Sequence, residues 1–155
     1  MARRLRWRWS VHGRPARSRL GDKAGDDFAA RLYLVFDYPL DRVPWAQRLG
    51  IRIARGLYGD QIPAAAICYV WHPEAATDTM IDSPYTSRVK MIVARGGARE
   101  DRWHDESRDI ATDFRRAFGQ EYGPGVAPLQ AVLVSADTDQ GGGEVTAFFG
   151  DILLS

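Results

Sequence analysis

The sequence has little cysteine and no long apolar run, and each shortage excludes a class of protein. Cys68 is the only cysteine among the 155 residues, which excludes an internal disulfide framework and a zinc site built from cysteines. No segment approaches the roughly 18 consecutive apolar residues of a membrane span. The basic start is not followed by the apolar stretch of an export signal, so we expect no signal peptide in the chain as written.

The remaining composition is that of a globular domain. Hydrophobic residues make up 45% of the chain, charged residues 26% and aromatic residues 11%, including five tryptophans. A chain of this length is long enough for one sizeable core, and two domains would each have a very small one. We therefore expect residues 1–155 to form a single domain.

Charge is unevenly distributed although the net charge is only +1. The first 20 residues carry seven arginines and no acid, whereas the rest of the chain carries 14 basic against 20 acidic residues. A basic arm of this kind is compatible with nucleic acid or an anionic surface as the partner. The explanation we favour is a general preference for arginine, because the chain contains only two lysines.

Alternating apolar and polar residues predict a mainly β protein. Leu5, Trp7, Trp9 and Val11 alternate with arginines and should line the inner face of a first strand. The other predicted strands are 28–38, 64–71, 88–94, 102–107, 129–136 and 144–154. We predict an antiparallel β-sandwich of jelly-roll type whose first and last strands are neighbours.

Two stretches instead predict short helices. In 44–58, apolar residues recur every four positions and form a stripe, with Arg48, Arg52 and Arg55 on another side as a solvated or anion-binding row. In 109–118, Ile110 and Phe114 should face the core and Gly119 should end the helix. The stretch 72–85 is predicted to be a long irregular loop.

Several strings occur in the same order as in one known family. They are GDDF (25–28), RLYLVFDYPL (31–40), AAAICYVW (64–71), PYT (84–86), RDIATDFRRAFG (108–119), ADTD (136–139) and FGDI (149–152). On these strings the chain resembles an uncharacterised bacterial family, domain of unknown function 3047 (DUF3047), almost throughout. The family has no established activity and therefore implies no catalytic residues. Its members often carry a signal peptide ahead of the Trp-Arg-Trp start, which implies export to the periplasm if this chain is an internal fragment.

A second, weaker resemblance concerns the last hairpin. An acidic, glycine-rich turn followed by Phe-Phe-Gly-Asp-Ile is similar to the end of galactose-binding-like jelly rolls. That resemblance implies a sugar-binding module with a structural calcium ion near the chain ends. The resemblance concerns the fold, and a shared fold says little about function.

Acidic turns supply the candidate calcium ligands. Calcium prefers six to eight oxygen ligands, which closely spaced carboxylates on flexible turns can provide in part. The candidates are Asp26, Asp27, Asp137, Asp139 and Asp151. The alternative for the 137–144 turn is an ordinary hairpin without a metal. Asp151 is predicted to lie on the apolar face of its strand, where the alternative is a buried ion pair with an arginine.

Aromatic residues at strand ends supply the candidate ligand site. Exposed rings of Trp71, Tyr85 and Trp103 could stack on the face of a sugar. No His-Glu-x-x-His, Gly-x-Ser-x-Gly or phosphate-loop string occurs, and Cys68 lies in the most apolar strand as a small core residue. We therefore favour a non-catalytic, carbohydrate-binding module at the cell envelope. The alternatives are a glycan hydrolase that uses Asp or Glu, and a nucleic-acid or polyanion binder that uses the basic arm.

Overall fold

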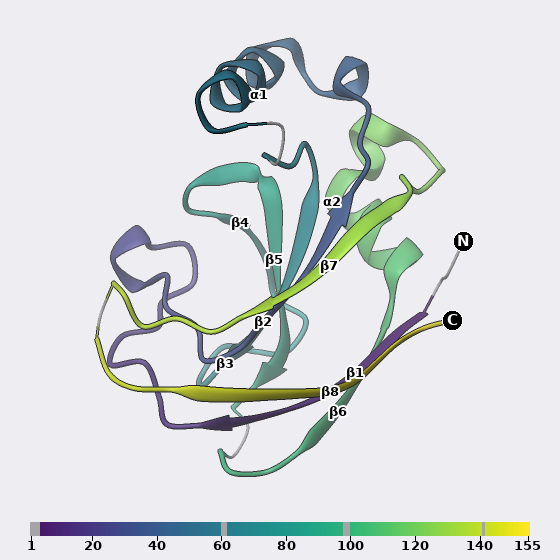
Figure 1. Cartoon of the computed structure of the whole chain (residues 1–155). Coiled ribbons are helices and arrows are strands. Elements are labelled where there is room, and N and C mark those ends of the chain that lie inside the picture. Colours follow the sequence, from purple (N-terminus) through teal and green to yellow (C-terminus); the bar gives the residue numbers. More distant parts are fainter. Residues whose placement is uncertain (1–3, 60–61, 98–99, 141) are drawn as a thin grey trace.

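The structure is a computed structural model that describes residues 4–59, 62–97, 100–140 and 142–155 (Figure 1). The strands are β1 (Arg4–His12), β2 (Arg31–Phe36), β3 (Ala66–His72), β4 (Met80–Ser83), β5 (Thr86–Gly96), β6 (His104–Asp109), β7 (Leu129–Ser135) and β8 (Thr146–Leu154). The helices are α1 (Trp45–Tyr58) and α2 (Ile110–Tyr122), with single 3-10 turns η1 (Lys23–Gly25) and η2 (Leu40–Arg42).

The strands form two sheets, as expected for a sandwich. The smaller sheet has the order β6-β1-β8 and is antiparallel, whereas the larger sheet has the order β4-β5-β3-β2-β7. Strands β3 and β5 are parallel, and every other adjacent pair of the larger sheet is antiparallel. The prediction of a mainly β sandwich with two helices is confirmed, and its one parallel pair makes the larger sheet mixed.

The parallel pair arises from strand β4, which lies inside the predicted irregular loop. Residues 80–83 form an antiparallel hairpin with β5, so the chain reverses once more between β3 and β5. These four residues, Met-Ile-Asp-Ser, do not alternate between apolar and polar, so local periodicity does not predict the strand. The prediction of an irregular loop throughout 72–85 was therefore wrong for this part.

The core lies between the two sheets. On the inner face of β1, Leu5, Trp7, Trp9 and Val11 are at most 2% exposed. They pack with alternate residues of β2 and β3 on the facing sheet, including Tyr69, whose ring centroid lies 5.3 Å from that of Trp7. Strand β1 thus places its apolar residues inside and its arginines outside, as its alternation predicts.

The first and last strands are neighbours, as predicted. Strand β8 pairs antiparallel with β1 along most of its length. Beyond the last paired residues, Arg4 N donates to Ser155 O at 2.9 Å and Ser155 N donates to Arg4 O at 3.0 Å. The described ends of the chain therefore lie side by side (Figure 1).

Helix α2 covers one part of the core. Its start is capped by the Asp109 carboxylate, which accepts a hydrogen bond from the Thr112 N–H at 2.8 Å. The ring centroid of Phe114 lies 4.8 Å from that of Phe36 on β2. The helix passes through Gly119, where we predicted its end, and stops at Gly123, whose φ is +87°. The extra turn brings Tyr122 onto Phe114, and that contact stabilises a longer helix than the glycine signal predicts.

Helix α1 lies at one end of the molecule, opposite the three-stranded sheet (Figure 1). It spans Trp45–Tyr58, between Pro44 and Gly59, close to the predicted bounds. Among the described residues, no helix is long and apolar enough to cross a membrane.

Candidate functional site

The three aromatic candidates do not meet in one cleft. Trp71 is only 2% exposed, because β3 is a central strand that is buried along its whole length. Its ring packs against Trp9 and against His104, with centroids 5.8 and 5.0 Å apart. Trp71 therefore has no free face for a ligand, and its prediction as a stacking platform was wrong.

The other two aromatic candidates are exposed but belong to different sheets. Tyr85 is 55% exposed on the turn between β4 and β5, where the Lys23 ammonium lies 5.5 Å from its ring centroid. Trp103 is 48% exposed just before β6, and the Arg8 guanidinium lies 4.9 Å from its ring centroid. Each ring thus contacts one cationic side chain, and about half of its surface is exposed to solvent.

A hollow of about 330 Å³ lies on the outer face of the three-stranded sheet, and one of its lining residues, Arg8, also contacts the Trp103 ring. Its lining consists of Arg6, Trp7, Arg8, Asp105, Glu106, Ser107, Asp151 and Leu153. These residues come from all three strands, with β1 in the middle. We call this hollow, together with Trp103, the outer-sheet site.

Donors and acceptors for a polar ligand stand around the outer-sheet site. Within the described part of the chain, Arg8 Nε is buried and has no hydrogen-bond partner. Its nearest ion-pair oxygen, on Asp105, is 3.8 Å away, beyond hydrogen-bond distance. The Arg8 side chain as a whole is 41% exposed, so its guanidinium can donate to a ligand hydroxyl, and the exposed carboxylates can accept from one.

Asp151 belongs to the outer-sheet site rather than to the core. The register between β1 and β8 shifts between Arg6 and Arg8, which marks a β-bulge opposite Trp7. Asp151 adopts a φ of +50° there and is exposed. The prediction that Asp151 lies on the buried apolar face was wrong, because one extra residue in the strand reverses the alternation from that point.

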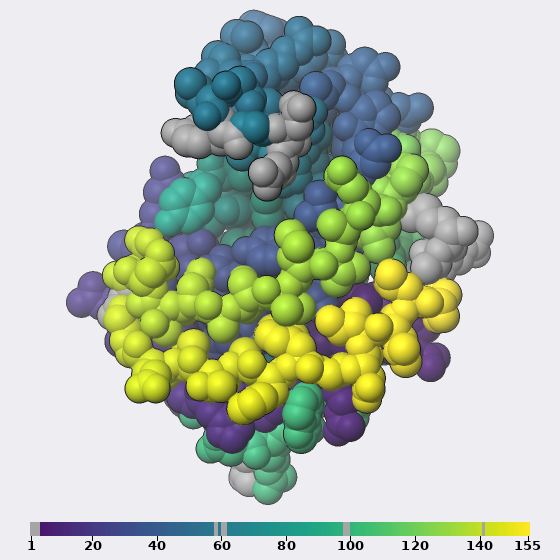
Figure 2. Space-filling model, in the orientation of Figure 1, coloured from purple at the N-terminus to yellow at the C-terminus, as the bar shows by residue number. Residues whose placement is uncertain are grey.

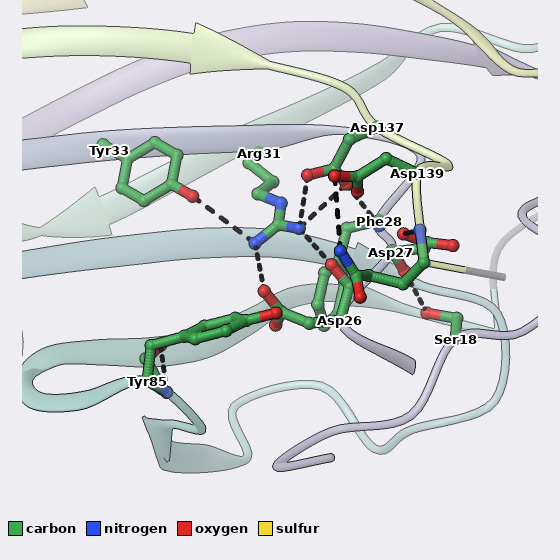
Figure 3. A network of polar contacts seen from close by, with 11 residues as sticks. Ser18, Asp26, Asp27, Phe28, Arg31, Tyr33, Tyr85, Asp137 and Asp139 are labelled. Carbon is green, nitrogen blue, oxygen red and sulfur yellow. Dashed lines mark hydrogen bonds and ion pairs between the residues drawn. The ribbon is translucent and has the colours of Figure 1, made fainter. Parts of the chain in front are cut away.

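A second cluster forms where the β1–β2 and β7–β8 connections meet (Figure 3). We call it the aspartate clasp; its members are Asp26, Asp27, Arg31, Asp137 and Asp139. Four of the five candidate metal ligands predicted from the sequence therefore lie together, in connections near the two ends of the chain. Asp151, the fifth, lines the outer-sheet site instead.

Arg31 is the centre of the aspartate clasp, and its side chain is only 6% exposed. Its Nη2 donates to both carboxylate oxygens of Asp137, at 2.8 and 2.7 Å, and also to the main-chain oxygen of Asp26. Its Nη1 donates to Asp26 Oδ2 at 3.2 Å. One guanidinium therefore joins the two connections through charge-assisted bonds.

Main-chain groups complete the aspartate clasp. The Gln140 N–H donates to Asp27 Oδ1 at 2.9 Å, and the Phe28 N–H donates to Asp137 Oδ1 at 3.1 Å. The Ser18 hydroxyl donates to the Asp27 main-chain oxygen at 2.8 Å. Each connection thus donates to a carboxylate of the other, which fixes both turns in place.

Negative charge is in excess in the aspartate clasp, with four carboxylates around one guanidinium. Burial raises the pKa of Asp26 above its usual value, and the lowering effect of Arg31 does not cancel it. One of its oxygens, Oδ1, is buried without a hydrogen-bond partner in the described part of the chain. Ligand oxygens of Asp27, Asp137 and Asp139 all lie within 4.8 Å of one another, close enough to hold one cation.

A third polar cluster, which the sequence did not single out, surrounds Arg88 at the start of β5. The Arg88 guanidinium lies between the rings of Tyr38 and Phe118, at 5.2 and 5.1 Å, and donates to Glu121 Oε1 at 2.5 Å. Tyr38 donates to the same oxygen at 2.6 Å. The sequence did not reveal Arg31 either. In an alternating strand pattern, an arginine is expected to point to the solvent, so neither Arg31 nor Arg88 was singled out.

Neither Cys68 nor the basic arm forms a reactive or continuous site. Burial raises the pKa of the Cys68 thiol to about 12, so the thiol stays protonated at neutral pH. Residues 4–12 of the basic arm form strand β1, and α1 with its arginines lies at the opposite end of the molecule from that strand (Figure 1). The arginines of β1 and those of α1 therefore do not join into one surface.

Comparison with known proteins adds a family to this description. No curated protein and no solved structure matched the chain. One family model matches residues 1–153, nearly the whole chain. The chain therefore belongs to the family described as protein of unknown function (DUF3047).

Proposed function

We propose that the protein is a non-catalytic module that binds carbohydrate of the cell envelope at the outer-sheet site. The observation that carries the proposal is the half-exposed Trp103 ring beside a hollow lined by guanidinium and carboxylate groups. An indole ring packs on the apolar C–H face of a pyranose, and charged side chains bind its hydroxyls. The guanidinium of Arg8, whose side chain is 41% exposed, is a donor for such a hydroxyl.

Binding is favoured over hydrolysis by the exposure of Asp105 and Asp151. The third acidic residue of the lining, Glu106, has a side chain that is only 8% exposed and forms an ion pair with Arg95 at 2.7 Å. Asp105 and Asp151 come from the strands on either side of β1, so two acids do face one hollow. A glycosidase needs one carboxyl that stays protonated near neutral pH, which requires shielding from water. The Asp105 side chain is 86% exposed, and Asp151 is exposed as well. A glycan hydrolase that uses these acids is the alternative.

A glycan array followed by calorimetry on the best ligand tests the proposal. We expect Trp103→Ala to weaken binding at least fivefold, because stacking on an aromatic ring contributes on the order of 1–3 kcal/mol and about 1.4 kcal/mol is a factor of ten. Trp45→Ala and Tyr85→Ala, which remove exposed rings elsewhere, are the matched controls and should leave the affinity unchanged. Absence of any glycan signal contradicts the proposal, and release of reducing sugar that is lost in Asp151→Asn favours the hydrolase.

A second proposal concerns the aspartate clasp, which we propose binds a structural calcium ion. The supporting observation is the excess of carboxylates, with three ligand oxygens within 4.8 Å of one another. Arg31 already donates to both oxygens of Asp137, so a cation would add its bonds on the side of Asp27 and Asp139. A divalent ion there would offset the excess of carboxylate charge over the one guanidinium of the clasp.

Thermal melting with calcium and with a chelator tests this second proposal. Saturating calcium, at about 100 times its dissociation constant, should stabilise the fold by about 2.7 kcal/mol and raise the melting temperature by roughly 5–10 °C. Asp139→Asn should abolish the shift, whereas Asp151→Asn, which removes a carboxylate at the other site, should retain it. A melting temperature that does not change with chelator would contradict the proposal of a structural calcium ion. It would leave the carbohydrate proposal unaffected.

A further inference from the structure

Helix α1 exposes an apolar face that no described part of the chain covers. Trp45, Leu49, Ile53 and Leu57 are 80, 57, 56 and 72% exposed, and we call them the α1 apolar face. Residues four apart lie in one row along a helix, so the four side chains form a continuous strip. Exposed single apolar residues are common, but a strip that runs the length of a helix marks an interaction surface.

The α1 apolar face is not the side of the helix that packs against the core. Ile51, on another side of the helix, is only 6% exposed and is the residue that contacts the core. Gln47 also holds the helix to the sheet, because Arg88 Nη1 donates to its side-chain oxygen at 3.2 Å. The helix is therefore attached by one side and presents its most apolar side outward.

Positive charge flanks the α1 apolar face. The helix contains Arg48, Arg52 and Arg55 and no acidic residue. Arg48 donates to the main-chain oxygens of Asp41 and Val43, and Arg55 donates to that of Ile62, so these bonds leave both charges unneutralised. Within the described part of the chain, no carboxylate forms an ion pair with any of the three.

The position of α1 suits contact with a flat surface. It lies at one end of the molecule, away from the three-stranded sheet (Figure 1), and its atoms form the outermost layer of that end in the space-filling view (Figure 2). A large body could therefore approach the helix without touching the outer-sheet site.

We propose that α1 docks the protein onto an anionic lipid surface. An amphipathic helix with a tryptophan and aliphatic residues on one side and arginines beside them lies in the membrane interface, with its apolar side among the acyl chains. The arginines are complementary to anionic headgroups and are attracted to such a surface. This inference is independent of carbohydrate binding and uses none of its residues.

Co-sedimentation with lipid vesicles tests the proposal on the whole chain. We expect binding to vesicles of phosphatidylglycerol and phosphatidylcholine, and at least tenfold weaker binding to vesicles of phosphatidylcholine alone. The double variant L49S/I53S should lose at least tenfold in binding, because both changes remove apolar contacts. Arg52→Glu should lose at least tenfold on the anionic vesicles only.

Controls separate this surface from a general loss of fold or from self-association. Trp103→Ala removes an exposed indole at the other end of the molecule and should bind vesicles as the unchanged protein does. The helix variants should keep the melting temperature of the parent, since the substituted side chains are exposed. The proposal is overturned by equal binding to neutral and anionic vesicles, by no binding to either, or by a dimer that L49S/I53S dissociates in sedimentation velocity.

Discussion

Strand β1 and helix α1 are both arginine-rich amphipathic segments, yet the protein uses them in opposite ways. The apolar residues of β1 are at most 2% exposed, whereas those of the α1 apolar face are 56–80% exposed. Strand β1 has a paired strand on each side and a second sheet in front of its apolar face. Helix α1 is attached through Ile51, on a different side from its most apolar row.

The difference shows what an amphipathic pattern does and does not determine. Periodicity identifies which side of an element is apolar, because it depends on the local geometry of strand or helix. Whether another element covers that side depends on the remaining topology, which periodicity does not record. The contrast between β1 and α1 can be tested by matched substitutions, beginning with tryptophans.

The largest expected effect is a difference between two tryptophan substitutions. Trp9→Ala should lower the free energy of unfolding by about 3–5 kcal/mol, because Trp9 is 0% exposed and its loss leaves a cavity in the core. Trp45→Ala should change it by less than about 0.5 kcal/mol, because this ring is 80% exposed. Urea unfolding measures both, and comparable losses would show that the two segments do not differ as described.

A smaller contrast is expected between two arginines. Arg31→Met leaves the carboxylates of Asp26 and Asp137 without their cation and should cost about 2–4 kcal/mol. We place it below Trp9→Ala because the Asp137 side chain is 35% exposed and water partly compensates. Arg52→Met on α1 should change stability by less than about 0.5 kcal/mol. Equal effects in urea unfolding would contradict a central role for Arg31 in the aspartate clasp.

The smallest expected effects are changes in the free energy of unfolding on acid titration. Helix α1 has no carboxyl group, so the two residues to be tested, Glu121 and Asp26, both lie outside it. Burial alone would raise the pKa of Glu121, but hydrogen bonds from Arg88 and Tyr38 outweigh it and hold that pKa below 4.5. A depressed pKa stabilises the fold above the unfolded value and loses this contribution as the pH falls through the folded value. Glu121→Gln should therefore flatten the loss of stability below pH 4.5.

Asp26 should show the opposite sign. Burial raises its pKa above 3.8, against the lowering effect of Arg31, so the folded state holds the proton more tightly than the unfolded one. Its contribution to stability is therefore present at low pH and is lost as the pH rises above 3.8 through the folded pKa. Asp26→Asn should gain stability relative to the parent over that rise. Urea unfolding from about pH 3 to 7 measures both variants, and slopes of the same sign would contradict the assignment.

Much of the fold could be predicted because its signals are local. The alternation in β1 and the run of apolar residues in β3 gave both strands, and the spacing of Trp45 and Leu49 gave α1. Strand β4 and the last turn of α2 could not be predicted in this way, since both depend on contacts that a local pattern does not record. These are the pairing with β5 for the strand, and the packing of Tyr122 on Tyr38 and Phe114 for the helix.

The candidate sites were predicted in part. The pairing of β1 with β8 follows from the sandwich, and it explains why acidic turns from both ends meet. The bulge that turns Asp151 outward is a single extra residue, which an alternating pattern cannot reveal. The buried position of Arg31 also left no signal, because its carboxylate partners include Asp137, which lies over a hundred residues further along the chain.

The pairing of Arg4 with Ser155 has a consequence for the way the chain can be cut and rejoined. Adjacent ends can be linked by a few residues without moving either strand, and a new start can be opened at an exposed turn. The turn between β4 and β5 is such a place. A circular permutant opened there should fold to the same two sheets, so the order in which the strands are synthesised is not what determines their arrangement.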